Sequence, residues 1–122
     1  MKHILIIEDD KWLADSYRST LEAGGYHVTA IQYAEAAFGI LGSKPTDLIL
    51  ADMLLNTNTV LPLLHELQTY EDTQKIPVIV CTSLDSPDID AKTLHYYGVV
   101  AVLNKTILTP EQLLISVQEM IL

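Results

Sequence analysis

Three consecutive acids, Glu8, Asp9 and Asp10, follow directly on the apolar run "ILII" at residues 4–7. Adjacent carboxylates repel one another, and removing charged groups from water is costly unless another interaction compensates. Three carboxylates at the end of a segment with a buried composition therefore either spread into solvent or bind a cation.

Polar residues also end three other apolar runs. Asp52 follows "LILA", Thr82 follows "VIVC", and Asn104 and Lys105 follow "VAVL". Carboxylate oxygens with open positions suit Mg²⁺, which also accepts phosphate oxygens. A hydroxyl and an ammonium group can hold the oxygens of a phosphoryl group, and a carboxylate can attack phosphorus to form an aspartyl-phosphate. If the fold gathers these side chains, the set fits phosphoryl transfer.

The spacing of apolar residues predicts which elements carry these side chains. Short aliphatic and β-branched runs, which indicate strands, lie at residues 3–7, 27–31, 47–51, 78–82 and 99–103. Longer patterns with helical spacing lie at residues 12–23, 33–42, 59–70, 88–98 and 109–122. Regular alternation of strand and helix predicts an α/β fold, a parallel sheet with helices on both faces. In such sheets, ligands bind beyond the carboxyl ends of the strands, so the polar residues are expected to converge there.

Two helix starts can be read from local signals. Thr109, Pro110 and Gln112 predict an N-cap, a proline at the first helical position and a capping box. Pro62 is compatible with a helix over 59–70 only in its first turn. Asp10 is expected to face solvent or to cap the first helix.

The totals limit the class of protein. The chain has 122 residues, the usual size of one domain, so residues 1–122 are interpreted as a single domain. No apolar run is long enough to span a bilayer and no signal peptide is evident, so we expect a cytoplasmic protein. Sixteen acids against seven bases give a net charge of −9, which argues against direct binding to nucleic acid or to an anionic membrane.

Four segments together resemble the signature segments of response-regulator receiver domains, the phosphoacceptor half of two-component signalling. They are "ILIIEDD", "DLILAD", "IPVIVCTS" and "VLNK", and they occur in the expected order across nearly the whole chain. The resemblance implies a flavodoxin-like, doubly wound sheet of five parallel strands in the order 2-1-3-4-5, with five helices.

The resemblance also implies roles for the residues at the strand ends. Asp52 would be phosphorylated from the phosphohistidine of a histidine kinase or phosphotransfer protein, and Thr82 and Lys105 would contact the phosphoryl oxygens. The implied Mg²⁺ ligands are Asp9 directly, Glu8 through water, Asp52, and the backbone carbonyl of Leu54.

The chain departs from the family pattern at several positions. Asn56 and Val60 stand where the family usually has proline and glycine, and Thr106 replaces the proline after the lysine, so the Lys105 loop is expected to be trans. Val102 replaces an aromatic residue that moves inward on phosphorylation, so we expect phosphorylation to be read out differently or weakly.

Two apolar positions bear on hydrolysis of the aspartyl-phosphate. Leu54 and Leu84 stand at the positions that control how water reaches the phosphorus in this family. Neither side chain can hydrogen-bond an attacking water, so we expect slow self-dephosphorylation.

Other functions stay open at this point. The chain could be a receiver-like interaction module that works without phosphorylation. A phosphohydrolase with an aspartyl nucleophile would usually carry a second carboxylate at the position of Leu54, so we do not expect a turnover enzyme. A flavin carrier is disfavoured because the acids would repel the flavin phosphate.

Output is expected through protein docking. The resemblance implies a downstream protein or a second copy of the chain, bound by the face that residues 88–98, 99–103 and 109–122 form. Tyr96 and Tyr97 are adjacent and cannot both face the core of one helix, so one of them is either a docking anchor or an ordinary exposed aromatic residue.

Overall fold

Five parallel strands form the central sheet of the computed structural model, which describes residues 1–55, 58–83 and 89–121. Their order is β2-β1-β3-β6-β7, so the predicted order 2-1-3-4-5 is confirmed, with β6 and β7 as its fourth and fifth members. The strands are β1 (His3–Ile7), β2 (His27–Ile31), β3 (Leu48–Asp52), β6 (Val78–Thr82) and β7 (Val99–Asn104). The fold is the flavodoxin-like one that the sequence predicts.

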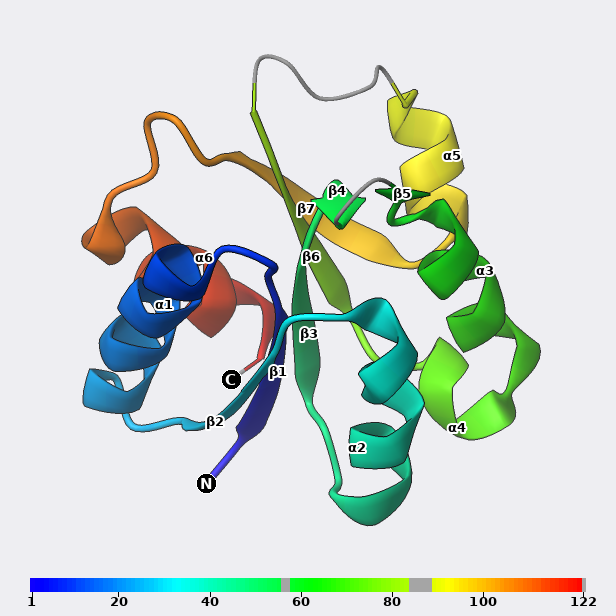
Figure 1. Cartoon of the computed structure of the whole chain (residues 1–122), viewed down its shortest axis with the longest axis horizontal. Helices are drawn as coiled ribbons and strands as arrows, with labels where there is room; N and C mark the ends of the chain where they lie inside the picture. The colour runs from blue at the N-terminus through cyan, green and yellow to red at the C-terminus, as the bar shows by residue number, and fades with distance from the viewer. Residues whose placement is uncertain (56–57, 84–88, 122) are drawn as a thin grey trace.

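Helices cover both faces of this sheet (Figure 1). Helices α1 and α6 lie on one face, and α2, α3, α4 and α5 lie on the other. The helices are α1 (Lys11–Ala23), α2 (Ala37–Ser43) after a 3₁₀ turn at Ala34–Ala36, α3 (Leu61–Thr69), α4 (Glu71–Gln74), α5 (Ala91–Tyr96) and α6 (Pro110–Met120). The described part of the chain thus has six α-helices where five were predicted, because the four-residue helix α4 follows α3 separately.

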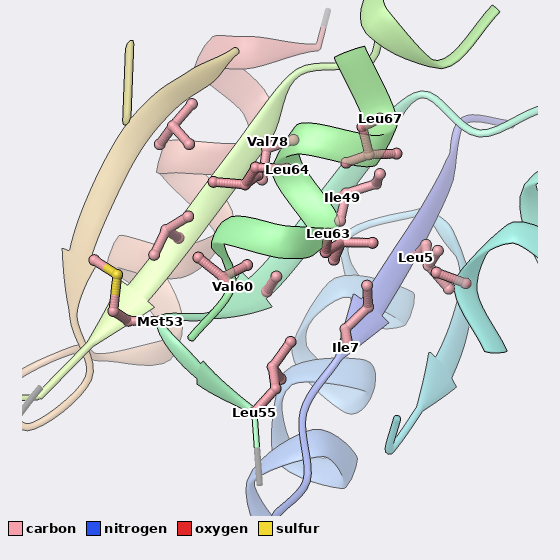
Figure 2. Packing of buried hydrophobic residues seen from close by; sticks show 14 of the residues in the cluster. Leu5, Ile7, Ile49, Met53, Leu55, Val60, Leu63, Leu64, Leu67 and Val78 are labelled. Atoms are coloured by element: carbon pink, nitrogen blue, oxygen red, sulfur yellow. The ribbon is translucent and has the colours of Figure 1, made fainter. Parts of the chain in front are cut away.

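Each face of the sheet has its own apolar core. Residues of β1, β3 and β6 alternate between the two faces, so Leu5 and Ile7 belong to one cluster and Ile4 and Ile6 to the other. Figure 2 shows the first cluster, where Leu63, Leu64 and Leu67 of α3 pack over the sheet. The strands β1 and β3 are buried throughout, which explains their nearly continuous apolar sequence.

The predicted helix starts are confirmed. Asp10 caps α1, because its Oδ1 accepts hydrogen bonds from the backbone N–H groups of Trp12 at 3.0 Å and Leu13 at 3.2 Å. Thr109 and Gln112 form the capping box of α6. Pro62 lies in the first turn of α3.

A small antiparallel hairpin between β3 and α3 was not predicted. It consists of β4 (Leu54–Leu55) and β5 (Asn58–Thr59). Leu55 is buried and packs in the same cluster as Met53 and Val60, as Figure 2 shows. The helix predicted over 59–70 therefore starts two residues late, because Thr59 belongs to β5 and Val60 caps α3.

No helix in the described ranges is long and apolar enough to cross a membrane.

Candidate functional site

The polar strand ends meet at the carboxyl edge of the sheet, as predicted. Glu8 follows β1 and Asp52 ends β3; both side chains are buried, whereas Asp9 is exposed. One carboxylate oxygen from each of these three residues lies within 4.8 Å of the other two. The fold thus brings three carboxylates together at the point where the chain order of the strands reverses, between β1 and β3.

Lys105 supplies a positive charge to this acidic cluster. Its Nζ donates a hydrogen bond of 2.9 Å to Asp52 Oδ2 and lies 3.5 Å from Glu8 Oε1. Burial would lower the pKa of Lys105, but the carboxyl groups of Asp52 and Glu8 outweigh burial and raise it. The lysine therefore stays charged and partly neutralises the two buried carboxyl groups.

Glu8 remains poorly compensated. Its Oε2 accepts a 3.1 Å hydrogen bond from the backbone N–H of Asp10, but its Oε1 accepts none from the described residues. Burial, together with the neighbouring Asp52, raises the pKa of Glu8 to about 9. One lysine is thus too little charge for this group of carboxylates, and the cluster has the chemistry of a site for a hard divalent cation.

The hairpin leaves the Leu54 carbonyl available. The backbone N–H of Val60 donates to the carbonyl of Met53 at 2.8 Å, so Met53 and Val60 occupy a hydrogen-bonded position of the ladder, although the N–H of Met53 donates to the carbonyl of Cys81 instead. Hydrogen-bonded and non-hydrogen-bonded pairs alternate in antiparallel strands, so the next pair, Leu54 and Thr59, exchanges no hydrogen bonds. The carbonyl of Leu54 therefore points away from the hairpin ladder and can serve as a ligand.

Thr82 lies beside Lys105 at the ends of the neighbouring strands β6 and β7. The backbone N–H of Lys105 donates to the carbonyl of Thr82 at 2.8 Å, which fixes the two residues relative to one another. The Thr82 hydroxyl is half-buried and donates to the carbonyl of Ser83 at 3.2 Å.

Asn104 organises the lysine loop, a role that sequence reasoning missed. Its Oδ1 accepts hydrogen bonds from the backbone N–H of Thr106 at 3.0 Å and from the Thr106 hydroxyl at 2.6 Å. Its backbone carbonyl accepts from the N–H of Ile107 at 3.2 Å. The peptide bond between Lys105 and Thr106 is trans, as expected, and these three bonds shape the turn without proline.

A model of the family described as response regulator receiver domain matches residues 4–118, nearly the whole chain. The chain belongs to this family. Receiver domains are signalling modules of two-component systems, and they interact with histidine kinases or phosphotransfer proteins.

Named relatives of this receiver include transcriptional regulators. It is 29% identical over 87 residues to the phosphate regulon transcriptional regulatory protein PhoB of Pseudomonas aeruginosa, covering 71% of the chain and 38% of that protein. It is 31% identical over 83 residues to the probable transcriptional regulator ycf29 of Cyanophora paradoxa, covering 68% of the chain and 40% of that protein. The receiver thus spans about two fifths of the length of these curated relatives.

Solved structures share its fold. The chemotaxis protein CheY4 of Vibrio cholerae superposes with a TM-score of 0.88 at 18% identity, covering 99% of both chains. The receiver domain of a signal transduction histidine kinase from Syntrophus aciditrophicus gives 0.81 at 25% identity, covering 98% of this chain and 89% of that one.

The structure describes some of the positions at which the chain departs from the family pattern. Val60 is fully buried beneath the hairpin, and Val102 is 47% exposed on the edge strand β7. Leu54 is 36% exposed. Asn56 and Leu84 lie outside the described residues. The expected weak readout through Val102 and the expected slow dephosphorylation stay predictions.

Proposed function

We propose that this receiver accepts a phosphoryl group on Asp52 from the phosphohistidine of a histidine kinase or phosphotransfer protein, and that it signals by docking to another protein. The observation that carries the proposal is the cluster of Glu8, Asp9 and Asp52 with the Lys105 ammonium 2.9 Å from Asp52. Residues 1–122 would act as one domain of a cytoplasmic signalling protein.

The same residues fit a bound Mg²⁺. Its protein ligands would be Asp9, Asp52, the Leu54 carbonyl, and Glu8 through water. The fit rests on the three clustered carboxylates and on Glu8 Oε1, which accepts no hydrogen bond from the described residues. When bound, Mg²⁺ supplies positive charge to the carboxylates and to the oxygens of the phosphoryl group.

The side chains perform the transfer by position and charge. A carboxylate oxygen of Asp52 forms a bond to phosphorus as the phosphorus–nitrogen bond breaks, and the imidazole nitrogen keeps the electron pair of that bond. The Lys105 ammonium would move from the carboxylate to an oxygen of the new phosphoryl group. The Thr82 hydroxyl would exchange its 3.2 Å bond to the Ser83 carbonyl for a bond to a second phosphoryl oxygen.

An exposed apolar face supports output by docking. Tyr96 on α5 is 78% exposed, and Val100 and Val102 on β7 are 44% and 47% exposed. Strand β7 is an edge of the sheet, so its outer side is open to a partner. Tyr97 is half-buried and stacks edge-on against His65, which leaves Tyr96 as the anchor we propose for a downstream protein or a second copy.

We infer that the receiver is not a turnover enzyme. Leu54, two residues after Asp52, offers no group that could activate water for hydrolysis. The aspartyl-phosphate is therefore expected to persist for minutes or longer in the purified protein, a lifetime that phosphate release from labelled protein measures.

Labelling with acetyl phosphate or a phosphorylated histidine kinase tests the proposal. Wild-type protein and an Asp72→Ala control, changed at an exposed acid of α4, should be labelled in the presence of Mg²⁺. Asp52→Ala should remain unlabelled, as should the wild type without Mg²⁺. If the wild type binds neither phosphoryl nor beryllofluoride groups, the phosphorylation-independent interaction module replaces this proposal.

A further inference from the structure

Arg18 is the one arginine in the sequence, and its charge has no partner among the residues that the structure describes. It lies on α1 and makes no ion pair or hydrogen bond with any residue in the described ranges, although the chain carries sixteen acids. Its Nε is shielded from solvent and donates no hydrogen bond to a described residue. A buried N–H donor without an acceptor is costly, so the position of Arg18 favours an anion that the described residues do not supply.

Arg18 lines a cavity next to the acidic cluster. The cavity has a volume of about 210 Å³ and lies between α1 and the carboxyl end of β2. Its walls include Lys11, Ala30, Ile31 and Gln32, and Glu8 of the acidic cluster also lines it. A single water needs only about 10–15 Å³ of such space, so the cavity can admit a larger polar group.

The charges along the cavity favour a singly charged anion. Lys11 is matched by Asp15, with Nζ 3.4 Å from Oδ2, but both side chains are largely exposed and such a pair exchanges easily. Arg18 therefore brings one positive charge that no described residue matches, and Lys11 can contribute a second. A carboxylate carries one negative charge, which Arg18 alone can balance, whereas a dianionic phosphate would also need Lys11 to leave Asp15; the two carboxylate oxygens match the planar guanidinium.

We propose that this cavity binds a carboxylate side chain of the protein that phosphorylates the receiver. The inference rests on the proposed function: Glu8 belongs to both the cavity and the acidic cluster, so a protein that reaches Asp52 would lie next to the cavity. One acid of the donor would thus fix its register on the receiver.

The first experiment tests the carboxylate chemistry without any phosphorylation. Because the chain has one arginine, its Nε–H gives one assignable resonance in a nitrogen–proton correlation spectrum. Titration with sodium acetate should shift this resonance saturably, whereas sodium chloride at equal ionic strength should not. The same shift with both salts, or no shift with either, overturns the proposed site, whether or not Asp52 can be phosphorylated.

The second experiment identifies the source of the carboxylate. Arg18→Lys keeps the positive charge but removes the planar guanidinium group. Lys92→Ala, a change in α5 at a residue that does not line the cavity, serves as the control. Arg18→Lys should slow transfer from a phosphorylated histidine kinase at least fivefold, while its labelling by phosphoramidate, a small donor without a carboxylate, should match the wild type. Equal slowing with both donors would assign Arg18 to the acidic site itself, and slowing with neither would exclude a donor carboxylate; both results overturn the proposal.

Discussion

At the scale of single residues, Glu8 shows most directly how the fold changes the chemistry of a side chain. Glu8 is 1% exposed, and one of its oxygens accepts no hydrogen bond from the described residues. Asp10, only two residues further along, is exposed and caps α1. Neighbouring acids in one short segment therefore have different tasks, because one faces the sheet edge and the other the start of a helix.

The first prediction concerns Glu8 and pH. Its pKa is raised to about 9 in the folded protein, so the folded state holds this proton more tightly than the unfolded state does. The stability that the Glu8 proton contributes to the folded state is fully present below about pH 4.5 and is lost as the pH rises from there to about 9. Without divalent metal, the free energy of unfolding of the wild type should fall relative to Glu8→Gln by on the order of 1 kcal/mol per pH unit between pH 6 and 8.

Urea unfolding in a chelator at several pH values measures this difference. Subtracting the Glu8→Gln curve removes the contribution of groups that both proteins share, such as His3, whose pKa is lowered by burial. A difference that does not change with pH would show that Glu8 is ionised in the folded protein.

The second prediction concerns Lys105. Its ammonium lies 2.9 Å from Asp52 Oδ2 and 3.5 Å from Glu8 Oε1, where it opposes a second cation in the same cluster. Removing this charge with Lys105→Met should tighten Mg²⁺ binding about tenfold. In free energy, this gain is a modest part of the roughly 4 kcal/mol with which two unit charges 4 Å apart interact at an effective dielectric constant of 20. Calorimetric titration measures the change, with Lys92→Met as control; weaker binding in Lys105→Met would mean that the lysine orders the ligands.

At the scale of elements, the hairpin of β4 and β5 carries the third prediction. Leu55 is 4% exposed and anchors the hairpin to the core, which in turn orients the Leu54 carbonyl. Leu55→Ala should lower the free energy of unfolding by about 2–4 kcal/mol and also weaken Mg²⁺ binding severalfold. Leu64→Ala, a fully buried change in α3, should cost similar stability and leave Mg²⁺ binding unchanged.

Both variants are compared at a temperature where circular dichroism shows them folded. Equal Mg²⁺ affinity in the two would separate the hairpin from the metal site.

The same elements show what can be predicted from this sequence. The five long strands were predicted to within one residue because their β-branched and aliphatic runs are distinct in the sequence. The positions of the acids and of Lys105 followed from the predicted ends of these strands. The hairpin was not predicted because its two-residue strands are too short to show any periodicity. Helix α4 was not predicted for the same reason. It is held against α3 by the Thr73 hydroxyl, which donates a hydrogen bond to the Leu67 carbonyl at 2.6 Å. Arg18 and Asn104 were missed because their roles depend on distances between segments, which spacing along the chain does not contain.

At the scale of the whole molecule, the net charge of −9 affects how partners approach. Acids outnumber bases by more than two to one, so a protein that reaches Asp52 meets a negative field at long range. The Arg18 cavity is a local exception within this field. A suitable donor would therefore present a basic face that carries a single matching carboxylate.

This combination leads to the last prediction. Salt screens long-range attraction, and the Debye length falls from about 10 Å at 0.1 M to about 3 Å at 1 M. Transfer from a phosphorylated histidine kinase at limiting concentration should slow about tenfold between 50 and 500 mM NaCl, because encounter of opposite charges is steered. Labelling by phosphoramidate, an anion repelled by the same field, should not slow. Kinase-driven transfer that is constant or faster in high salt would mean that the donor surface is neutral or acidic, and that the receiver's charge serves solubility rather than recognition.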